Sequence, residues 1–286
     1  MRTGFIGAGK VGCTLGKYFT INGIEVSGFY SRNLSSAQFA AELTGKKAYK
    51  ELSEILNDSD TLFITVPDGA VRGVYEQLTK LGINGKVLCH CSGSMTSREA
   101  FPDIDKYGAY GCSVHPLFPI SSRTDSYKVL SEAFFCIEGD REPAGKWRDI
   151  IRSMGNTARM IAGESKSSYH AACAIMSNLV CGLAQTSLEL LKGCGFTEKE
   201  ALAALRPLAE NNIKNIFENN PSAALTGPVE RNDVGTIKKH LDCIPEGIDS
   251  EIYKCVSLKL TELAQLRHPD SDYSELIYLL DDIEKE

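Results

Sequence analysis

The first twelve residues constrain the fold more than any other stretch of the chain. A short apolar segment at residues 3–6 (TGFI) runs directly into residues 7–12 (GAGKVG), and a segment of helical character follows. A strand, the spacing G-x-G-x-x-G and a helix in this order are typical of a loop that binds the pyrophosphate of a dinucleotide. Gly7 permits the tight turn, Gly9 keeps a Cβ away from the phosphates, and Gly12 lets the helix pack close to the strand. The helix N-terminus then offers free N–H groups and the positive end of its dipole.

The length and composition are those of an ordinary globular protein. At 286 residues, with 43% hydrophobic and 24% charged residues, the chain is long enough for two domains. A net charge of −6 gives no electrostatic footprint for nucleic acid. No apolar run is expected to approach the length of a membrane span, and the N-terminus has the pattern of a strand rather than a signal peptide. We therefore expect neither a nucleic acid nor a membrane partner.

The ten cysteines are scattered and include no C-x-x-C pair. This usage is typical of reduced thiols, so a cytoplasmic location is expected. Cys89 and Cys91 flank His90, but successive residues of a strand face opposite sides, so the two cysteines would share one face and His90 would lie on the other. No metal site is predicted.

The second expected strand, residues 24–30, decides which dinucleotide is favoured. An acidic residue usually follows this strand in proteins that select NAD, and none is present here. Ser31 and Arg32 stand there instead and could bind a 2′-phosphate. The expected cofactor is therefore NADP(H); the less favoured alternative is that Arg32 is only a solvated loop charge. The predicted contacts of the loop and this strand end are Gly7, Ala8, Gly9, Lys10, Val11, Gly12, Ser31 and Arg32.

Strands and helices alternate through the first half. Further strands are expected at 61–66, 87–91, 112–117, 133–138 and 158–161, with helices at 34–43, 52–56, 69–81 and 143–154. This order predicts an α/β fold with a doubly wound sheet. The carboxyl ends of such strands meet the cofactor crevice, which makes Val66, Pro67 and Ser92 candidate cofactor contacts. Ser92 could also be an ordinary turn residue. His115 could be a catalytic acid or base, but a buried structural or substrate-lining role is favoured.

The second half has helical periodicity only. A helix of about 27 residues is expected from Ser165 to Leu191, followed by a capping box at Thr197 and Glu200 that opens the next helix. A polar loop at 225–233 (LTGPVERND) precedes the last helices. The expected domains are a dinucleotide-binding domain at 1–162 and an all-α domain for substrate and dimerisation at 163–286.

A reaction would take place in the cleft between two such domains. His170 lies near the start of the long helix, and Asn178 follows eight residues later on a neighbouring face. His170 could act as general acid, and Asn178 could position a substrate. His170 could also be a satisfied core histidine. In the polar loop, Arg231 could clamp a carboxylate, or could pair with Asp233 at a helix start.

Six segments together resemble a known family. The chain is similar to Rossmann-like proteins with a helical DUF2520 domain, and more distantly to ketopantoate reductase, pyrroline-5-carboxylate reductase, β-hydroxyacid dehydrogenases and F420-dependent NADP reductases. The matching segments are residues 7–12, Ser31-Arg32, residues 66–68, His115-Pro116, residues 169–178 (YHAACAIMSN) and residues 225–233. The resemblance implies a C-terminal domain of the 6-phosphogluconate dehydrogenase C-terminal-like type and a homodimer. It also implies that Thr226, Gly227 and Arg231 line the substrate site.

The resemblance includes one departure at the catalytic helix. Ketopantoate reductases carry a catalytic lysine eight residues before an asparagine, and matching that asparagine to Asn178 places His170 at the lysine position. A second asparagine of that family corresponds to Ala174, which argues against ketopantoate as substrate. The expected function is NADP(H)-dependent reduction of a small carbonyl or imine. The alternatives are a non-catalytic NADP(H) sensor and a deazaflavin-dependent NADP reductase.

Overall fold

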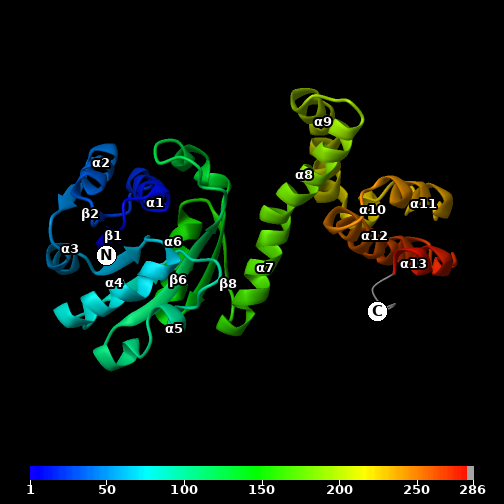
Figure 1. Cartoon of the computed structure of the whole chain (residues 1–286). Helices are drawn as coiled ribbons and strands as arrows, with labels where there is room; N and C mark the ends of the chain where they lie inside the picture. Colours follow the sequence, from blue (N-terminus) through cyan, green and yellow to red (C-terminus); the bar gives the residue numbers. More distant parts are fainter. Residues whose placement is uncertain (282–286) are drawn as a thin grey trace. The chain divides into compact units, whose positions relative to one another are not determined.

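The computed structural model describes residues 1–281 and divides by its internal contacts into two units, Met1–Ala174 and Ile175–Glu286 (Figure 1). The sequence predicts a boundary between residues 162 and 163, just before helix α7 (Lys166–Met176). The division by contacts falls inside α7 instead. The first turns of α7 belong with the first unit because Lys166 is buried against its strands.

The first unit is built on one eight-stranded sheet with the order β3-β2-β1-β4-β5-β6-β7-β8. All neighbouring strands are parallel except β6 and β7, which are antiparallel. The doubly wound α/β prediction is confirmed, but strand–helix alternation alone did not predict the reversal at β7. The strands are β1 (Thr3–Ile6), β2 (Val26–Tyr30), β3 (Lys47–Tyr49), β4 (Thr61–Ile64), β5 (Val87–His90), β6 (Tyr110–Leu117), β7 (Phe134–Gly139) and β8 (Thr157–Met160).

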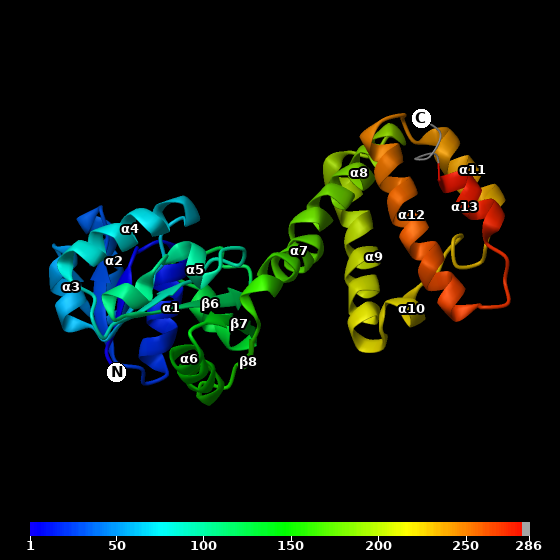
Figure 2. The ribbon, with the colours of Figure 1, turned by 90° about the horizontal axis from the view of Figure 1, so that it is seen from below.

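Helices cover both faces of the sheet. One face packs against α1, α2 and α6 and the other against α3, α4 and α5, so α4 and α6 lie on opposite sides in Figure 2. Adjacent residues of the central strands enter different cores, as expected for strands buried on both faces. The helices are α1 (Lys10–Ile21), α2 (Leu34–Thr44), α3 (Leu52–Asp58), α4 (Asp68–Leu81), α5 (Ser97–Ala100) and α6 (Arg141–Ser153), with 3-10 turns η1 (Ile104–Tyr107), η2 (Ser126–Glu132) and η3 (Gly163–Ser165).

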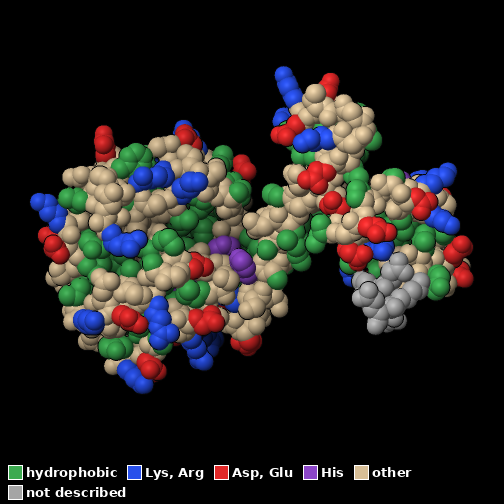
Figure 3. Space-filling view, in the orientation of Figure 1, with side chains coloured by type: hydrophobic (Ala, Val, Ile, Leu, Met, Phe, Trp, Pro, Cys, Tyr) green, Lys and Arg blue, Asp and Glu red, His purple; other side chains and the backbone are tan. Residues whose placement is uncertain are grey.

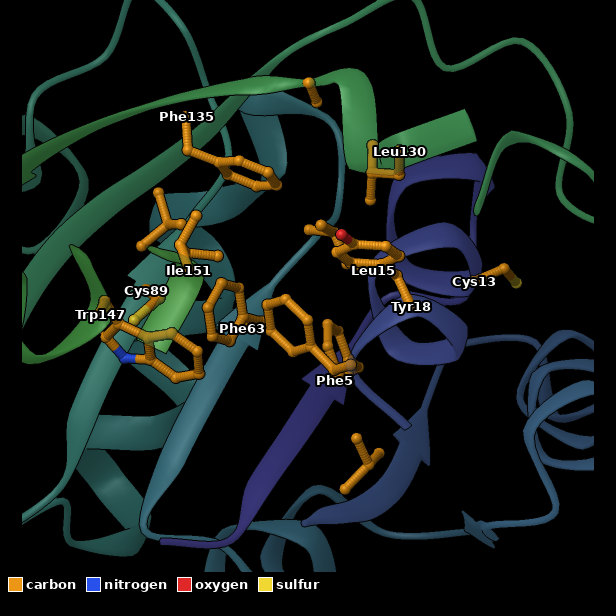
Figure 4. Close-up of a cluster of buried hydrophobic side chains, with 14 of the residues drawn as sticks. Phe5, Cys13, Leu15, Tyr18, Phe63, Cys89, Leu130, Phe135, Trp147 and Ile151 are labelled. Carbon is orange, nitrogen blue, oxygen red and sulfur yellow. The ribbon is translucent and has the colours of Figure 1, made fainter. Parts of the chain in front are cut away.

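Aromatic rings fill the larger of these two cores (Figure 4). Phe63 of β4 lies between Phe5 of β1 and Trp147 of α6, with ring centroids 5.4 Å and 4.7 Å away. The first pair is stacked and the second edge-on, and ring pairs at such distances add to the hydrophobic stabilisation of the buried area. This core ties α1 and α6 to the central strands, which fixes the position of the loop between β1 and α1.

The second unit is helical throughout its described residues, which end at 281. Its own core contains Ile237, Tyr273, Leu276 and Leu280, all nearly inaccessible to solvent. The predicted capping box is confirmed, since Thr197 and Glu200 cap α9 reciprocally. The helices are α8 (Asn178–Gly193), α9 (Glu198–Asn219), α10 (Pro221–Ala224), α11 (Val234–Cys243), α12 (Ile248–Arg267) and α13 (Ser274–Leu280).

The stretch expected to be one helix from Ser165 to Leu191 is interrupted. Helix α7 ends at Met176, Ser177 has φ −120° and ψ −75°, and α8 begins at Asn178. The expectation that no apolar run approaches the length of a membrane span is wrong. The 31-residue segment Gly163–Gly193, which comprises η3, α7 and α8, contains an unburied window with a mean hydropathy of 1.4, and by length and composition it could cross a membrane. Length and composition alone do not distinguish a membrane span from a helix that another protein surface covers.

Candidate active site

A cavity of about 600 Å³ lies at the carboxyl ends of β1, β2 and β4 in the first unit. This is the edge of a parallel sheet where ligands bind in open α/β folds. The cavity brings together most of the predicted cofactor contacts. Its lining includes Gly7, Ala8, Gly9, Lys10, Ser31, Arg32, Ser36, Val66, Pro67, Gln77 and Arg123.

The three glycines of the loop have different structural requirements. Gly7 has φ +107°, a conformation that side chains rarely adopt. A Cβ on Gly12 would lie 2.1 Å from the Gly7 carbonyl oxygen and 2.6 Å from Thr65 Oγ1. A Cβ on Gly9 would meet no atom within 4 Å. The protein itself therefore requires Gly7 and Gly12, whereas the open space beside Gly9 fits a phosphate cradle at the start of α1.

The end of β2 presents polar groups to the same cavity. Half-buried Ser31 and exposed Arg32 line it, and Ser36 of α2 joins them. Asn33 is used locally, because its Oδ1 accepts a hydrogen bond from the Ser35 N–H at 3.0 Å and caps α2. The guanidinium of Arg32 and the hydroxyls of Ser31 and Ser36 suit a 2′-phosphate.

A second group of side chains surrounds Gly93, which follows β5. A Cβ on Gly93 would lie 2.6 Å from His170 Cδ2 and 3.0 Å from both Cε1 and Nε2 of His115. His115 Nδ1 is 2.7 Å from the Tyr169 hydroxyl, and their rings meet edge to face. Histidine side chains gather beside α7 on the surface in Figure 3. The structure thus brings His170 and His115 together, although they lie far apart in the sequence.

Lys166 and Glu138 form a buried ion pair in this region. Lys166 Nζ donates to Ser113 Oγ on β6 and lies 3.9 Å from Glu138 Oε2 on β7. Glu138 also accepts hydrogen bonds from the N–H and the hydroxyl of Ser97, both at 2.8 Å. Burial lowers the pKa of Lys166, and the Glu138 carboxylate opposes this shift. The ion pair joins α7 to two strands and so fixes where Tyr169 and His170 lie.

Burial holds the imidazole of His115 neutral. Burial lowers the pKa of His115 to about 4, and the charges of Lys166 and His170 add to the shift. Burial also raises the pKa of Tyr169, with smaller contributions from the thiols of Cys136 and Cys173. The phenol of Tyr169 keeps its proton and can donate a hydrogen bond to Nδ1 of the neutral imidazole of His115. The ring proton is then on Nε2, which is directed toward Gly93.

Buried His90 makes the folded state sensitive to acid. Burial lowers the pKa of His90 to about 3, and the neighbouring Lys166 adds to this effect. An unfolded histidine titrates near pH 6.5, so between that pH and about 3 only the unfolded chain takes up this proton. The contribution of His90 to the stability of the folded state is therefore fully present above pH 6.5 and is lost progressively as the pH falls. His90 alone should lower the free energy of unfolding by roughly 2 kcal/mol from pH 7 to pH 5.

Urea unfolding at pH 7 and pH 5 measures this loss. In His90→Phe the decrease in the free energy of unfolding between the two pH values should be smaller than in the wild type, because the His90 imidazole is absent. Some decrease should persist, because buried His115 remains. An equal decrease in both proteins would show that His90 does not contribute.

Four other predicted cofactor contacts differ in whether they line the cavity. Val66 and Pro67 line the cavity. Ser92 is buried, and its hydroxyl donates to Asp68 Oδ2 at 2.6 Å while accepting from the Met95 N–H at 3.1 Å. The hydroxyl of Ser92 therefore orders the loop after β5. Val11, in the first turn of α1, packs partly buried against the aromatic core.

The remaining predicted residues belong to the second unit. Asn178 is exposed at the start of α8, where its Oδ1 accepts from the Ser177 hydroxyl at 3.1 Å. Gly227 has φ +101°, and Thr226 and exposed Arg231 lie in the same loop. Asp233 caps α11 by accepting from the Thr236 N–H at 3.0 Å. Hydrogen bonds from the hydroxyl and the N–H of Thr236 lower the pKa of this carboxyl, and the charge of Arg231 adds a smaller effect.

Three residues of the first unit were missed by the sequence interpretation. The sequence patterns assign no functional role to Tyr169, Lys166 or Arg123. Both Tyr169 and Lys166 precede His170 by a few residues, so their helical spacing gave a weak signal. Arg123 lies in a connection without periodicity, and no sequence signal placed it in the cavity.

Models of two protein families match this chain. The model of the Rossmann-like domain matches residues 1–116, and that of the domain of unknown function DUF2520 matches residues 133–260. The chain joins a Rossmann-like domain to a DUF2520 domain. The family resemblance inferred from the sequence segments is thereby confirmed. A comparison with curated proteins finds no match.

Solved structures share the two-domain fold. Protein TM1727 from Thermotoga maritima is 26% identical with a TM-score of 0.74, over 93% of this chain and 99% of that one. Protein BF3122 from Bacteroides fragilis, a proposed NADP oxidoreductase, is 21% identical with a TM-score of 0.69, over 91% and 98%. An imine reductase from Myxococcus stipitatus in complex with NADP⁺ is 13% identical with a TM-score of 0.64, over 98% and 99%. At identities this low, the TM-scores establish a shared fold, and the activities of these proteins are stated of those proteins alone.

Proposed function

We propose that this Rossmann-like and DUF2520 protein is an NADP(H)-dependent oxidoreductase that reduces a small carbonyl or imine. The observation that carries the proposal is the cavity that runs from the glycine loop to Ser31 and Arg32. Its shape and donors fit a dinucleotide, because open space adjoins Gly9 and a guanidinium stands at the end of β2. The NADP⁺ complex of the structurally similar imine reductase supports the same assignment.

Different residues of the cavity would bind different parts of the dinucleotide. The N-terminus of α1, with Gly9, Lys10 and Val11, would hold the diphosphate, while Ser31 and Arg32 would hold the 2′-phosphate. Val66 and Pro67 would pack against the adenosine side. The bound NADPH would supply the hydride for reduction.

The side chains around Gly93 would supply the proton. His170 is exposed at this point, so a substrate could reach its imidazole. We assign His170 as the proton donor to the carbonyl oxygen or imine nitrogen. His115 is kept neutral by burial and by Lys166, and would present Nε2–H to the substrate. The assignment of Asn178, Thr226, Gly227 and Arg231 of the second unit as substrate contacts stays a prediction from the sequence.

Calorimetric titration with NADPH and NADH tests the cofactor assignment. NADPH should bind more tightly, because the Arg32 guanidinium can form charge-assisted hydrogen bonds to a 2′-phosphate that NADH lacks. Arg32→Gln should raise the Kd for NADPH about 10- to 100-fold and leave the Kd for NADH nearly unchanged. Equal binding of the two dinucleotides, or binding of neither, would contradict the proposal.

Turnover is tested separately from binding. Cyclic imines, 2-oxo acids and aldehydes should be screened for NADPH oxidation, which is followed by the loss of nicotinamide absorbance. Tight NADPH binding without oxidation by any of these classes would favour a cofactor sensor over an enzyme.

A further inference from the structure

The connection between β6 and β7, residues 118–133, reaches the glycine loop at two points. The Thr14 hydroxyl of α1 donates to the Ser122 carbonyl oxygen at 3.3 Å. Arg123 Nη2 donates to the Ala8 carbonyl oxygen at 2.6 Å. These bonds hold residues 122 and 123 against the turn where β1 passes into α1.

The backbone around Arg123 is also ordered by its own side chains. Ser122 Oγ accepts hydrogen bonds from the N–H groups of Thr124 and Asp125, both at 3.2 Å. The Ser126 hydroxyl accepts from the Ser122 N–H at 3.0 Å. Arg123 is therefore held in place before any ligand binds, which lowers the entropy lost on binding.

The guanidinium of Arg123 has only neutral groups as its observed partners. Besides the Ala8 carbonyl, its Cζ lies 4.3 Å from the centre of the Phe39 ring, a cation–π contact. Its Nε is buried and has no hydrogen-bond partner among residues 1–281, and the Cys13 thiol is a further neutral neighbour of the guanidinium. A buried donor without a partner is costly, and a positive charge paired only with neutral groups attracts an anion.

The cavity beside Arg123 is suited to anions. Lys10, Arg32 and Arg123 all line it, and within residues 1–281 no acidic side chain contributes to the lining. Arg32 stands at the end of β2, whereas Arg123 is bound to Ala8 at the turn into α1. The two arginines therefore serve different ends of the cavity.

We propose that Arg123 binds phosphate in this cavity, and that its guanidinium contacts the dinucleotide diphosphate at the N-terminus of α1. The inference rests on the proposed cofactor. It adds to the glycine loop a cation from a distant part of the chain. Since NADPH and NADH share the diphosphate, Arg123 contributes to affinity for both, whereas Arg32 contributes to the choice between them.

The test compares Arg123→Gln with the wild type in calorimetric titrations with NADPH and NADH. The shorter glutamine side chain stays polar but removes both the positive charge and the Nη2 hydrogen bond to the Ala8 carbonyl. The Kd should rise about 10- to 100-fold for both dinucleotides by a similar factor. The salt dependence of the Kd should also become weaker. Arg159→Gln, which removes an exposed arginine from β8, is the matched control and should bind as the wild type does.

Arg123→Lys is a second variant that tests the proposal if the glutamine variant does not fold. An ammonium keeps the charge but lacks the planar fork of the guanidinium, so a smaller rise in Kd is expected for both dinucleotides. Unchanged Kd values in Arg123→Gln, or a loss confined to NADPH, would overturn the proposal. If the wild type binds neither dinucleotide, the proposed function is contradicted, and the role of Arg123 that depends on it is contradicted as well. If the wild type binds and Arg123→Gln binds equally well, only the role of Arg123 fails.

Discussion

Gly12→Ala should destabilise the first unit by several kcal/mol, while Gly9→Ala should leave its stability nearly unchanged. The new methyl group at residue 12 would lie 2.1 Å from the Gly7 carbonyl oxygen, which is backbone and cannot rotate away. Helix α1 would have to move away from β1, and overpacking of this kind costs about 1–3 kcal/mol or more. Urea unfolding followed by circular dichroism measures the loss.

The paired variant separates folding from binding. The methyl group of Gly9→Ala enters open space beside the N-terminus of α1, where φ of −80° suits any residue. Its unfolding midpoint should match the wild type, but the methyl group would occupy room needed by the diphosphate, so the Kd for NADPH should rise at least 10-fold. Wild-type NADPH affinity in Gly9→Ala would show that the space beside Gly9 is not a phosphate site. Equal stability of Gly12→Ala and the wild type would refute the packing argument.

His170→Ala should reduce turnover by two to four orders of magnitude with little change in NADPH affinity. Loss of a general acid typically costs a factor of about 10² to 10⁴ in rate. The side chain is exposed beside Gly93 and away from the lining of the dinucleotide cavity, so binding should persist. The measurement is NADPH oxidation with whichever imine, oxo acid or aldehyde the wild type reduces.

Ser168→Ala is a matched control, because it truncates another exposed side chain on the same turn of α7. This variant should keep wild-type turnover. If His170→Ala also keeps it, His170 is not the proton donor. The phenol of Tyr169, with its 2.7 Å contact to His115, would then be the next group to examine.

Features encoded by consecutive residues could be predicted from the sequence. The glycine loop occupies six adjacent positions, and the capping box at Thr197 and Glu200 spans four, so local chemistry alone determines both. The buried run at β4 identified a central strand because its residues are apolar on both faces. Strand β3 was missed, since its three residues, Lys47–Tyr49, are too few to show a pattern and include an exposed lysine.

The candidate site was only partly predictable, because its contacts depend on the tertiary fold. His115 and Tyr169 are 54 residues apart, and Lys166 is 53 residues from Ser113. Both pairings arise because α7 starts against β6 and β7, which no periodicity reveals. Arg123 is 115 residues from Ala8. Its place in the cavity follows from the path of an irregular connection, and composition gives no information about such a path.

The reversed direction of β7 has a consequence for how this protein could be altered. Strand β6 ends at the carboxyl edge of the sheet, and an antiparallel β7 starts at that same edge, so the connection at 118–133 never crosses to the other side. A parallel β7 would have needed a crossover, with most of the connection placed on a face. Length changes in this connection can therefore remodel the dinucleotide cavity while the sheet stays the same. For a protein engineer, residues 118–133 are a place to retune cofactor affinity without redesigning the core.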